Sequence, residues 1–144
     1  MEPLTGNKFD GQHPTGRVRV LVVDDQEPFL AAIRAVLSRI ADVELAGEAR
    51  SGEEAIELAA SLRPDLVLMD INMGAVDGIE ATRRIVASAP DTFVILVSTY
   101  PLDDLPTSAR SSGARAYVNK DELSPRVLRR LWEAGGDPGW RSEG

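Results

Sequence analysis

Residues 65–78, DLVLMDINMGAVDG, decide the fold of this chain. The run 66–69 is apolar without polar alternation, which is typical of a parallel strand buried on both faces. Asp70 follows at the carboxyl end of this strand, and a polar loop then leads to Asp77-Gly78, where we expect a helix to begin. Because open α/β sheets bind ligands in loops at the carboxyl ends of their strands, Asp70 is the first candidate site residue.

Further strands and helices alternate along the chain on both sides of this stretch. Strands are expected at 17–23, 43–48, 93–97 and 115–119. Helices are expected from Pro28 to Ile40, from a cap at Ser51 to about Leu62, over 79–89, over a short stretch at 106–112, and from a cap at Ser124 to Ala134. This alternation predicts an α/β fold with a parallel sheet and right-handed crossovers.

We expect a single domain over residues 17–134. Residues 1–16 have no periodicity and read as a disordered arm or an added leader, and residues 135–144 read as a flexible tail or a linker stub. The one histidine, His13, lies in the arm with no second His or Cys to join it, so a metal or catalytic role is not expected there.

Composition excludes several classes of function. The 144 residues include no cysteine, which removes disulfides, thiolate metal sites and cysteine nucleophiles. With 16 Lys and Arg against 23 Asp and Glu, the net charge is -7. That balance argues against direct binding to nucleic acid. No run approaches the roughly 18 apolar residues of a membrane-spanning helix, and we expect a soluble, cytoplasmic protein without a membrane partner.

Polar side chains follow four of the expected strands at the point where each strand ends. Asp24 and Asp25 follow the first strand, Asp70 the third, Ser98 the fourth and Lys120 the fifth. Taken singly, such an Asp is more often a helix cap or turn residue, such a Ser a loop hydroxyl and such a Lys a solvated lysine. All strand ends of a parallel sheet point the same way, however, so these residues are expected to converge on one edge as a site.

The charges of this cluster indicate what it binds. Two carboxylates about 5 Å apart repel by roughly 3 kcal/mol at an effective dielectric constant of ~20. A divalent hard cation relieves that repulsion, and Mg²⁺ is the usual choice because it also takes phosphate oxygens as ligands. Since a carboxylate is a competent nucleophile towards phosphorus, we predict that Asp70 accepts a phosphoryl group as an acyl phosphate.

These residues, in this order and strand-end context, resemble the receiver domain of two-component response regulators, a CheY-like, flavodoxin-like fold with strand order 2-1-3-4-5. The segments AGEARSGEEAIELAASLRPDLVLMDINM (46–73) and YVNKDELSP (117–125) are most similar to receivers of the NarL/LuxR class. The resemblance implies phosphorylation of Asp70 by a histidine kinase or phosphotransfer protein. It further implies a switch of the face formed by the fourth and fifth strands that controls an output.

Roles for further residues follow from the resemblance. Asp24, Asp25 and Asp70 would hold Mg²⁺, together with the backbone carbonyl of Asn72. Ser98 would be the switch hydroxyl and Lys120 the lysine that pairs with the phosphoryl group. Tyr117 would turn inward on activation, although a half-exposed strand tyrosine is the alternative. A homodimer would form through the fourth helix, fifth strand and last helix, or through the first and last helices.

The sequence departs from the family pattern at several positions. Gly74 and Asp121 stand where proline is common, and Thr99 stands where a smaller residue is usual. Pro101 and Pro106 break the region of the fourth helix, which usually belongs to the output face.

Three alternatives to a phosphorylated receiver remain at this point. A receiver fold used only as an interaction scaffold would normally have lost part of the acid set. An aspartyl phosphohydrolase would need a general acid at the position of Asn72, and a flavodoxin-like cofactor binder would need a phosphate loop after the first strand. We therefore expect a signalling regulator and not a turnover enzyme.

Overall fold

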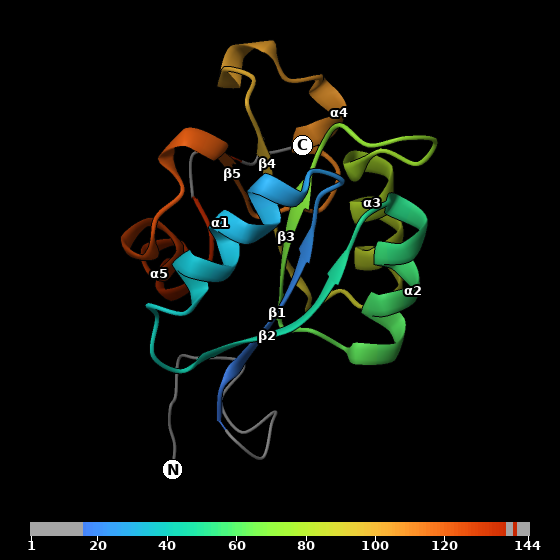
Figure 1. Ribbon diagram of the computed structural model, residues 1–144. Coiled ribbons are helices and arrows are strands. Elements are labelled where there is room, and N and C mark those ends of the chain that lie inside the picture. The colour runs from blue at the N-terminus through green and yellow to red at the C-terminus, as the bar shows by residue number, and fades with distance from the viewer. Residues whose placement is uncertain (1–15, 138–139, 141–144) are drawn as a thin grey trace.

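A five-stranded parallel sheet forms the middle layer of the molecule (Figure 1). The structure, a computed structural model, describes residues 16–137 and residue 140. The strands are β1 (Val18–Val23), β2 (Val43–Ala49), β3 (Leu66–Asp70), β4 (Phe93–Ser98) and β5 (Ala116–Asn119). Their order is β2-β1-β3-β4-β5, and every neighbouring pair is parallel. The expected doubly wound fold and strand order are confirmed.

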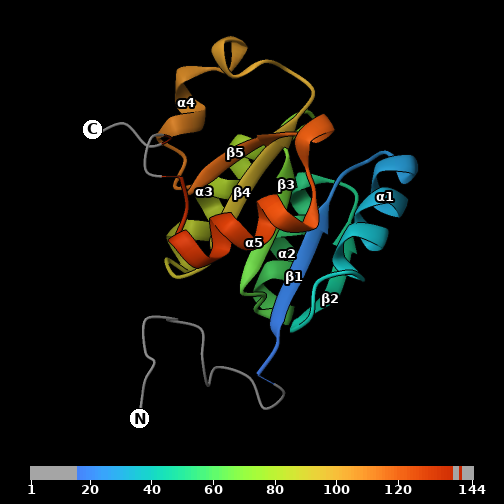
Figure 2. The same ribbon diagram turned by 90° about the vertical axis from the view of Figure 1, so that its left-hand side faces the viewer.

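Helices cover both faces of the sheet. Helices α1 (Glu27–Leu37) and α5 (Pro125–Ala134) lie on one face, and α2 (Gly52–Leu62) and α3 (Gly78–Ser88) lie on the other (Figures 1 and 2). Each face has its own apolar core, because the central strands are buried on both sides. Among residues 16–137 and 140, the structure contains no helix long and apolar enough to cross a bilayer.

The predicted helix caps at Ser51 and Ser124 are present. Ser51 Oγ accepts a hydrogen bond from the Glu54 N–H (3.0 Å), and Ser124 Oγ accepts one from the Val127 N–H (3.2 Å). Asp77 caps α3 in the same way, accepting from the Glu80 N–H at 2.9 Å. These caps fix where α2, α3 and α5 begin, and most other element boundaries lie within one residue of those expected.

The fourth helix is shorter than the sequence predicted. A helix was expected over 106–112, whereas α4 spans Thr107–Arg110 and is preceded by a 3₁₀ turn at Leu102–Asp104. The Ser112 hydroxyl donates to the Ala109 carbonyl at 2.7 Å, and Gly113 then adopts a φ of +103°. The chain therefore leaves the helix before Ser112.

The expectation of a flexible tail is wrong for Trp140. This side chain is only 3% exposed and belongs to the apolar core on the α2–α3 face. The sequence prediction missed it because a single aromatic residue among Gly, Pro and polar residues shows no periodicity. The expected arm at 1–16 lies outside the described residues except for Gly16.

Candidate functional site

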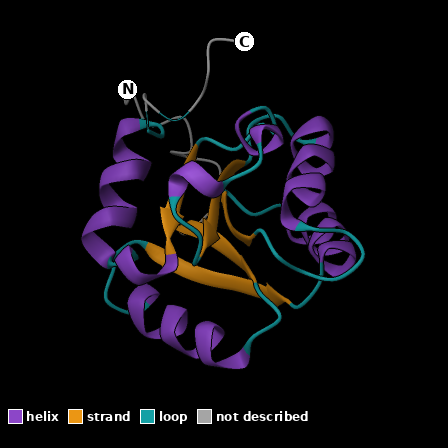
Figure 3. Cartoon of the chain, turned by 90° about the horizontal axis from the view of Figure 1, so that it is seen from above, coloured by secondary structure: helices purple, strands orange, loops and turns teal. Residues whose placement is uncertain are grey.

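The carboxyl ends of the strands meet at one edge of the sheet, which Figure 3 shows from above. Asp24 directly follows β1, Asp70 and Ser98 are the last residues of β3 and β4, and Lys120 directly follows β5. One carboxylate oxygen from each of Asp24, Asp25 and Asp70 lies within 4.8 Å of the others. The acids and the lysine predicted as one site are therefore brought together.

The acid cluster is buried on one side and open on the other. Asp24 is fully buried and Asp70 is 4% exposed, whereas Asp25 is exposed. Burial, together with the negative charge of Asp24, raises the pKa of Asp70 to about 6. The Lys120 ammonium and the backbone N–H of Asn72 act in the opposite direction by stabilising the Asp70 carboxylate. Asp70 is thus a buried carboxylate whose ionised form is disfavoured, and Asp25 is the exposed member of the cluster.

Lys120 joins two of the three acids. Its Nζ lies 2.6 Å from Asp24 Oδ2 and 3.3 Å from Asp70 Oδ1. Burial disfavours the ammonium form, but the hydrogen bond to Asp24 and the charge of Asp70 outweigh it, so the pKa of Lys120 is raised. The ammonium also lies 4.5 Å from the centre of the Phe29 ring, a cation–π contact from α1. In the sequence, Phe29 reads only as one apolar residue of the first expected helix, so this contact has no local signal.

The loop between β1 and α1 holds the first two acids in place. The Gln26 N–H donates to Asp24 Oδ1 at 2.8 Å, and Gln26 Nε2 donates to Asp25 Oδ1 at 3.4 Å. The next residue, Glu27, begins α1, and its carboxylate accepts hydrogen bonds from both Arg34 (3.0 Å) and Arg50.

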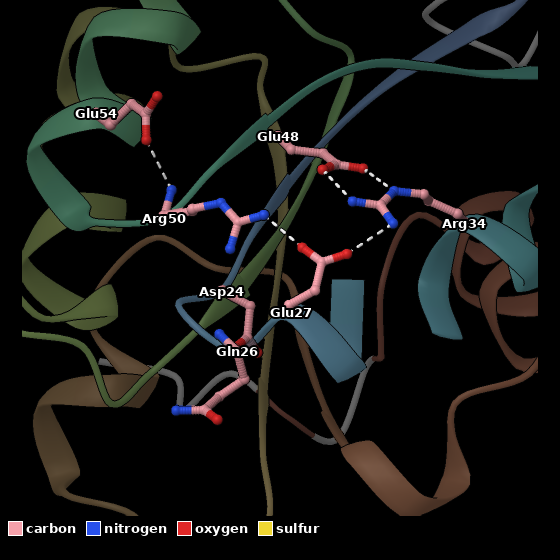
Figure 4. Close-up of polar contacts among 7 residues, drawn as sticks. All are labelled: Asp24, Gln26, Glu27, Arg34, Glu48, Arg50 and Glu54. Atoms are coloured by element: carbon pink, nitrogen blue, oxygen red, sulfur yellow. Dashed lines mark hydrogen bonds and ion pairs between the residues drawn. The ribbon is translucent and has the colours of Figure 1, made fainter. Parts of the chain in front are cut away.

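A charged network ties this loop to the neighbouring elements (Figure 4). Arg34 Nε and Nη2 bind the two oxygens of Glu48 at 2.6 and 2.8 Å, and the Arg50 N–H donates to Glu54 Oε1 at 2.8 Å. The pKa of Glu48 is lowered mainly by its hydrogen bonds from Arg34. Exposed ion pairs contribute little stability one by one, but this network connects α1, β2 and α2 beside the acid cluster.

Gly78 allows α3 to begin directly against the backbone of Asp70. A Cβ at position 78 would lie 2.0 Å from the Asp70 carbonyl oxygen and 2.9 Å from Ile71 Cα. The Gly78 N–H instead donates to the Ile71 carbonyl at 2.9 Å. This close approach of Gly78 to the Asp70 backbone has no signal in the sequence, because Asp77-Gly78 reads as an ordinary turn into a helix.

Ser98 lies at the same edge but has no hydrogen bond to Asp70 in the described part of the chain. Its Oγ accepts a hydrogen bond from the Tyr100 N–H at 2.8 Å, and its side chain is buried. The Tyr117 hydroxyl donates to the carbonyls of Ser98 (3.1 Å) and Tyr100. Tyr117 is half-buried with its hydroxyl bonded at the end of β4, and its inward turn on activation stays a prediction.

The donor set suits a hard cation. Three carboxylates supply only oxygen ligands, and with Lys120 they leave a formal charge of -2. The backbone of Asn72 lies beside them, since its N–H donates to the Asp70 carboxylate. The residues present therefore fit a divalent ion such as Mg²⁺.

Comparison with known proteins places the chain in a family. Residues 20–131 match the profile of the response regulator receiver domain. The chain is 41% identical over 103 residues to the response regulator GacA of Pseudomonas viridiflava, a match that covers 72% of this chain and 48% of GacA. It therefore spans about half the length of the curated relatives it matches.

Solved structures agree with this assignment. The response regulator domain of Thermotoga maritima CheB superimposes with a TM-score of 0.74 at 31% identity, covering 85% of this chain and 99% of that domain. The signal receiver domain of the putative response regulator NarL from Mycobacterium tuberculosis gives a TM-score of 0.73 at 29% identity, covering 82% and 95%. This chain belongs to the receiver domain family of two-component response regulators.

Proposed function

We propose that Asp70 accepts a phosphoryl group from a histidine kinase or a phosphotransfer protein, in a reaction that requires Mg²⁺. The observation that supports this most directly is the position of the Asp70 carboxylate. It lies at a strand end beside Asp24 and Lys120, with a raised pKa, and Asp25 is the exposed member of the cluster. A carboxylate whose ionised form is disfavoured by its surroundings is a reactive nucleophile towards phosphorus.

The transfer is a displacement at phosphorus. An Asp70 oxygen attacks the phosphorus atom, and the bond from phosphorus to the donor breaks with its electron pair going to the donor. A histidine nitrogen then takes up a proton from solvent, whereas acetate leaves as the anion. Before the reaction, Lys120 Nζ lies 3.3 Å from Asp70 Oδ1. After it, the ammonium pairs with an oxygen of the bound phosphoryl group, because the negative charge then lies there. Asp24 stays beside it as the second partner of the ammonium, at 2.6 Å.

Asp24, Asp25, Asp70 and the backbone carbonyl of Asn72 would hold the metal ion. When bound, Mg²⁺ supplies charge neutralisation for the incoming phosphoryl oxygens. Without the ion, the negative charges of Asp24 and Asp25 oppose the approach of a phosphate dianion to Asp70. This is why we expect no uptake in the absence of the ion.

Phosphorylation of Asp70 is then read out through Ser98 and Tyr117. The Ser98 hydroxyl now accepts from the Tyr100 N–H, and it would leave this bond to donate to a phosphoryl oxygen. Because the Tyr117 hydroxyl bonds to the carbonyls of Ser98 and Tyr100, that movement reaches β5 directly. The face around β4 and β5 would carry the signal to an output.

Intact-mass spectrometry tests the acceptor. The native chain is incubated with Mg²⁺ and acetyl phosphate, a small phosphoryl donor, next to the variant Asp70→Asn. We expect one phosphoryl group on the native chain, none on Asp70→Asn, and none on the native chain when EDTA removes the ion.

The control variant must be folded for this comparison to hold. Asp70→Asn keeps the size of the side chain and removes one buried negative charge, so we expect it to fold and to melt no lower than the native chain. A phosphoryl group on Asp70→Asn would place the acceptor elsewhere. Absence of uptake by the native chain, from both acetyl phosphate and a phosphorylated histidine kinase, would reject the function.

A further inference from the structure

The C-terminal segment returns to the body of the protein through Trp140. This indole is 3% exposed and packs in the core on the α2–α3 face, whereas α5, the helix that precedes it, belongs to the opposite face. Trp140 and α5 therefore lie on opposite faces of the sheet. After α5 the chain lies beside Arg115, the residue before β5, because the Asp137 N–H donates to its carbonyl at 3.0 Å.

The recess that receives Trp140 exists because its walls are small. Helix α4 has four residues and contributes only Ala109 as a buried side chain. Ala114, just before β5, is fully buried as well. A longer fourth helix with large apolar residues would fill this space itself. The indole of Trp140 can therefore be buried here because α4 is short and its buried side chain is small.

Several directional contacts hold the indole in this recess. Trp140 Nε1 donates to the Ala114 carbonyl at 3.3 Å, so its only polar atom is satisfied. The Arg110 guanidinium lies 4.7 Å from the ring centre and also donates to the Trp140 carbonyl. These contacts come from Arg110 in α4 and from Ala114 just before β5, and these two parts of the chain form the recess.

The fourth contact connects Trp140 to the proposed site. Its ring lies 6.1 Å from the ring of Tyr117 at an interplanar angle of 30°, in a stacked arrangement. The other end of Tyr117, its hydroxyl, bonds to the carbonyls of Ser98 and Tyr100. Trp140 therefore contacts the ring of Tyr117, whose hydroxyl is bonded to the end of β4 at Ser98 and to Tyr100 just after it.

We propose that the recess between α4 and β5 is a docking site for the chain's own C-terminal segment, with Trp140 as its anchor, and that docking is coupled to the state of Asp70 through Tyr117. The coupling rests on the proposed function, whereas the docking does not. Coupling between two sites is reciprocal. If docking of Trp140 raises the affinity of the Asp70 site for a phosphoryl mimic by some factor, binding of the mimic raises the equilibrium constant for docking by the same factor.

Fluorescence tests the docking. The chain has two tryptophans, so Trp132→Phe leaves Trp140 as the only one. We expect blue-shifted emission and acrylamide quenching several-fold weaker than in the same protein unfolded in guanidinium. Quenching equal to that of the unfolded protein would overturn the docking. Emission that depends on protein concentration would assign the contact to a second copy and overturn the intramolecular arrangement.

Calorimetric titration with beryllofluoride, a phosphoryl mimic, in the presence of Mg²⁺ tests the coupling. We expect Trp140→Ala to weaken binding about 3-fold or more, because Tyr117 loses its support. Trp140→Phe should remain close to native, since an aromatic ring still stacks on Tyr117. The matched control is Trp132→Phe, which changes a tryptophan packed against Phe93 on the other face and should have no effect.

Each result of this titration has one meaning. Equal or tighter binding by Trp140→Ala would overturn the coupling. If the native chain bound no beryllofluoride and took up no phosphoryl group, the proposed function and the coupling would both fail, while the quenching experiment would still decide the docking. If Trp140→Ala failed to fold, the comparison of Trp140→Phe with a Tyr117→Leu variant would replace it, with weaker binding expected only for Tyr117→Leu.

Discussion

Asp70 is a buried carboxylate whose surroundings disfavour its ionised form. Its pKa is raised to about 6, first by burial and then by the charge of Asp24. The folded protein therefore binds a proton at Asp70 more tightly than the unfolded chain, whose carboxyl has the ordinary value of 3.8. Ionising Asp70 costs folding free energy, so this residue stabilises the protein less as the pH rises through the window between these two values.

The first prediction concerns this cost. Without divalent ions, Asp70→Asn should be more stable than the native chain at neutral pH, by about 1–2 kcal/mol after allowance for screening by solvent. The difference should vanish as the pH falls towards about 4, where the native Asp70 is protonated in the folded state. Urea denaturation at a series of pH values measures it. A variant less stable than the native chain at neutral pH would mean that the Asp70 carboxylate is a net structural contributor.

The pH dependence of phosphoryl uptake follows from the same pKa. With the Asp70 carboxylate as the proposed nucleophile, the initial rate of uptake from acetyl phosphate should fall with decreasing pH, approaching tenfold per pH unit below the pKa of Asp70 in the Mg²⁺-bound protein. This midpoint should lie below the value of about 6 of the metal-free site and move further down as the Mg²⁺ concentration rises, because the cation favours the ionised form. A midpoint that does not respond to the Mg²⁺ concentration would contradict the assignment of Asp70 as nucleophile.

Phe29 is expected to position Lys120 through the contact of its ring with the ammonium. Phe29→Leu keeps an apolar side chain but removes the cation–π contact, and we expect uptake from acetyl phosphate to slow by about 3–10-fold. Phe29→Tyr retains the ring and should remain near the native rate. In a Lys120→Met background, Phe29→Leu should cause no further loss. A full additional loss in that background would assign Phe29 to packing alone.

At the scale of elements, the sequence predicted what periodicity and caps determine. The buried run before Asp70, the caps at Ser51 and Ser124 and the alternation of strands and helices are all local signals, and each led to an element that the structure contains. The extent of α4 and the burial of Trp140 were not predictable in this way. Both depend on packing between segments about thirty residues apart, which no local pattern encodes.

The residues of the candidate site also differ in whether local sequence signals could predict them. Asp24, Asp70 and Lys120 could be predicted because strand ends converge in any parallel sheet. Phe29 and Gly78 could not, since a cation–π contact and a close backbone approach depend on exact placement of the helices. A residue that looks apolar or merely flexible in the sequence can therefore be part of the site geometry.

The junction of β3 and α3 gives a prediction for one element. Gly78→Ala places a Cβ at 2.0 Å from the Asp70 carbonyl, and backbone on both sides leaves no side chain to move away. We expect a loss of about 3 kcal/mol or more in urea denaturation, together with slower phosphoryl uptake. The matched control is Gly47→Ala in β2, where the nearest atom is the flexible end of Leu62. Equal effects of the two substitutions would show that α3 can shift at its first turn.

For the whole molecule, we expect the acid cluster to make stability depend on divalent ions. At a Mg²⁺ concentration ten times the dissociation constant, the folded state gains about 1.4 kcal/mol, which raises Tm by about 3–6 °C. Calorimetry with and without millimolar Mg²⁺ measures the shift, with Ca²⁺-free buffers. The shift should be lost in Asp25→Asn and kept in Asp103→Asn, which removes the same charge from an exposed turn outside the cluster. An unchanged Tm in the native chain would rule out the metal site.

The passage of the chain beside β5 has one more consequence for the molecule as a whole. An edge strand exposes unpaired backbone groups to which another chain can add a strand, and proteins limit this hazard by keeping such edges short or covered. Strand β5 has four residues, and the stretch from Gly136 to Asp137 lies against the residue that precedes it. Asp137 thus occupies the backbone carbonyl at the start of this edge, so that an added strand could not pair with it at that position.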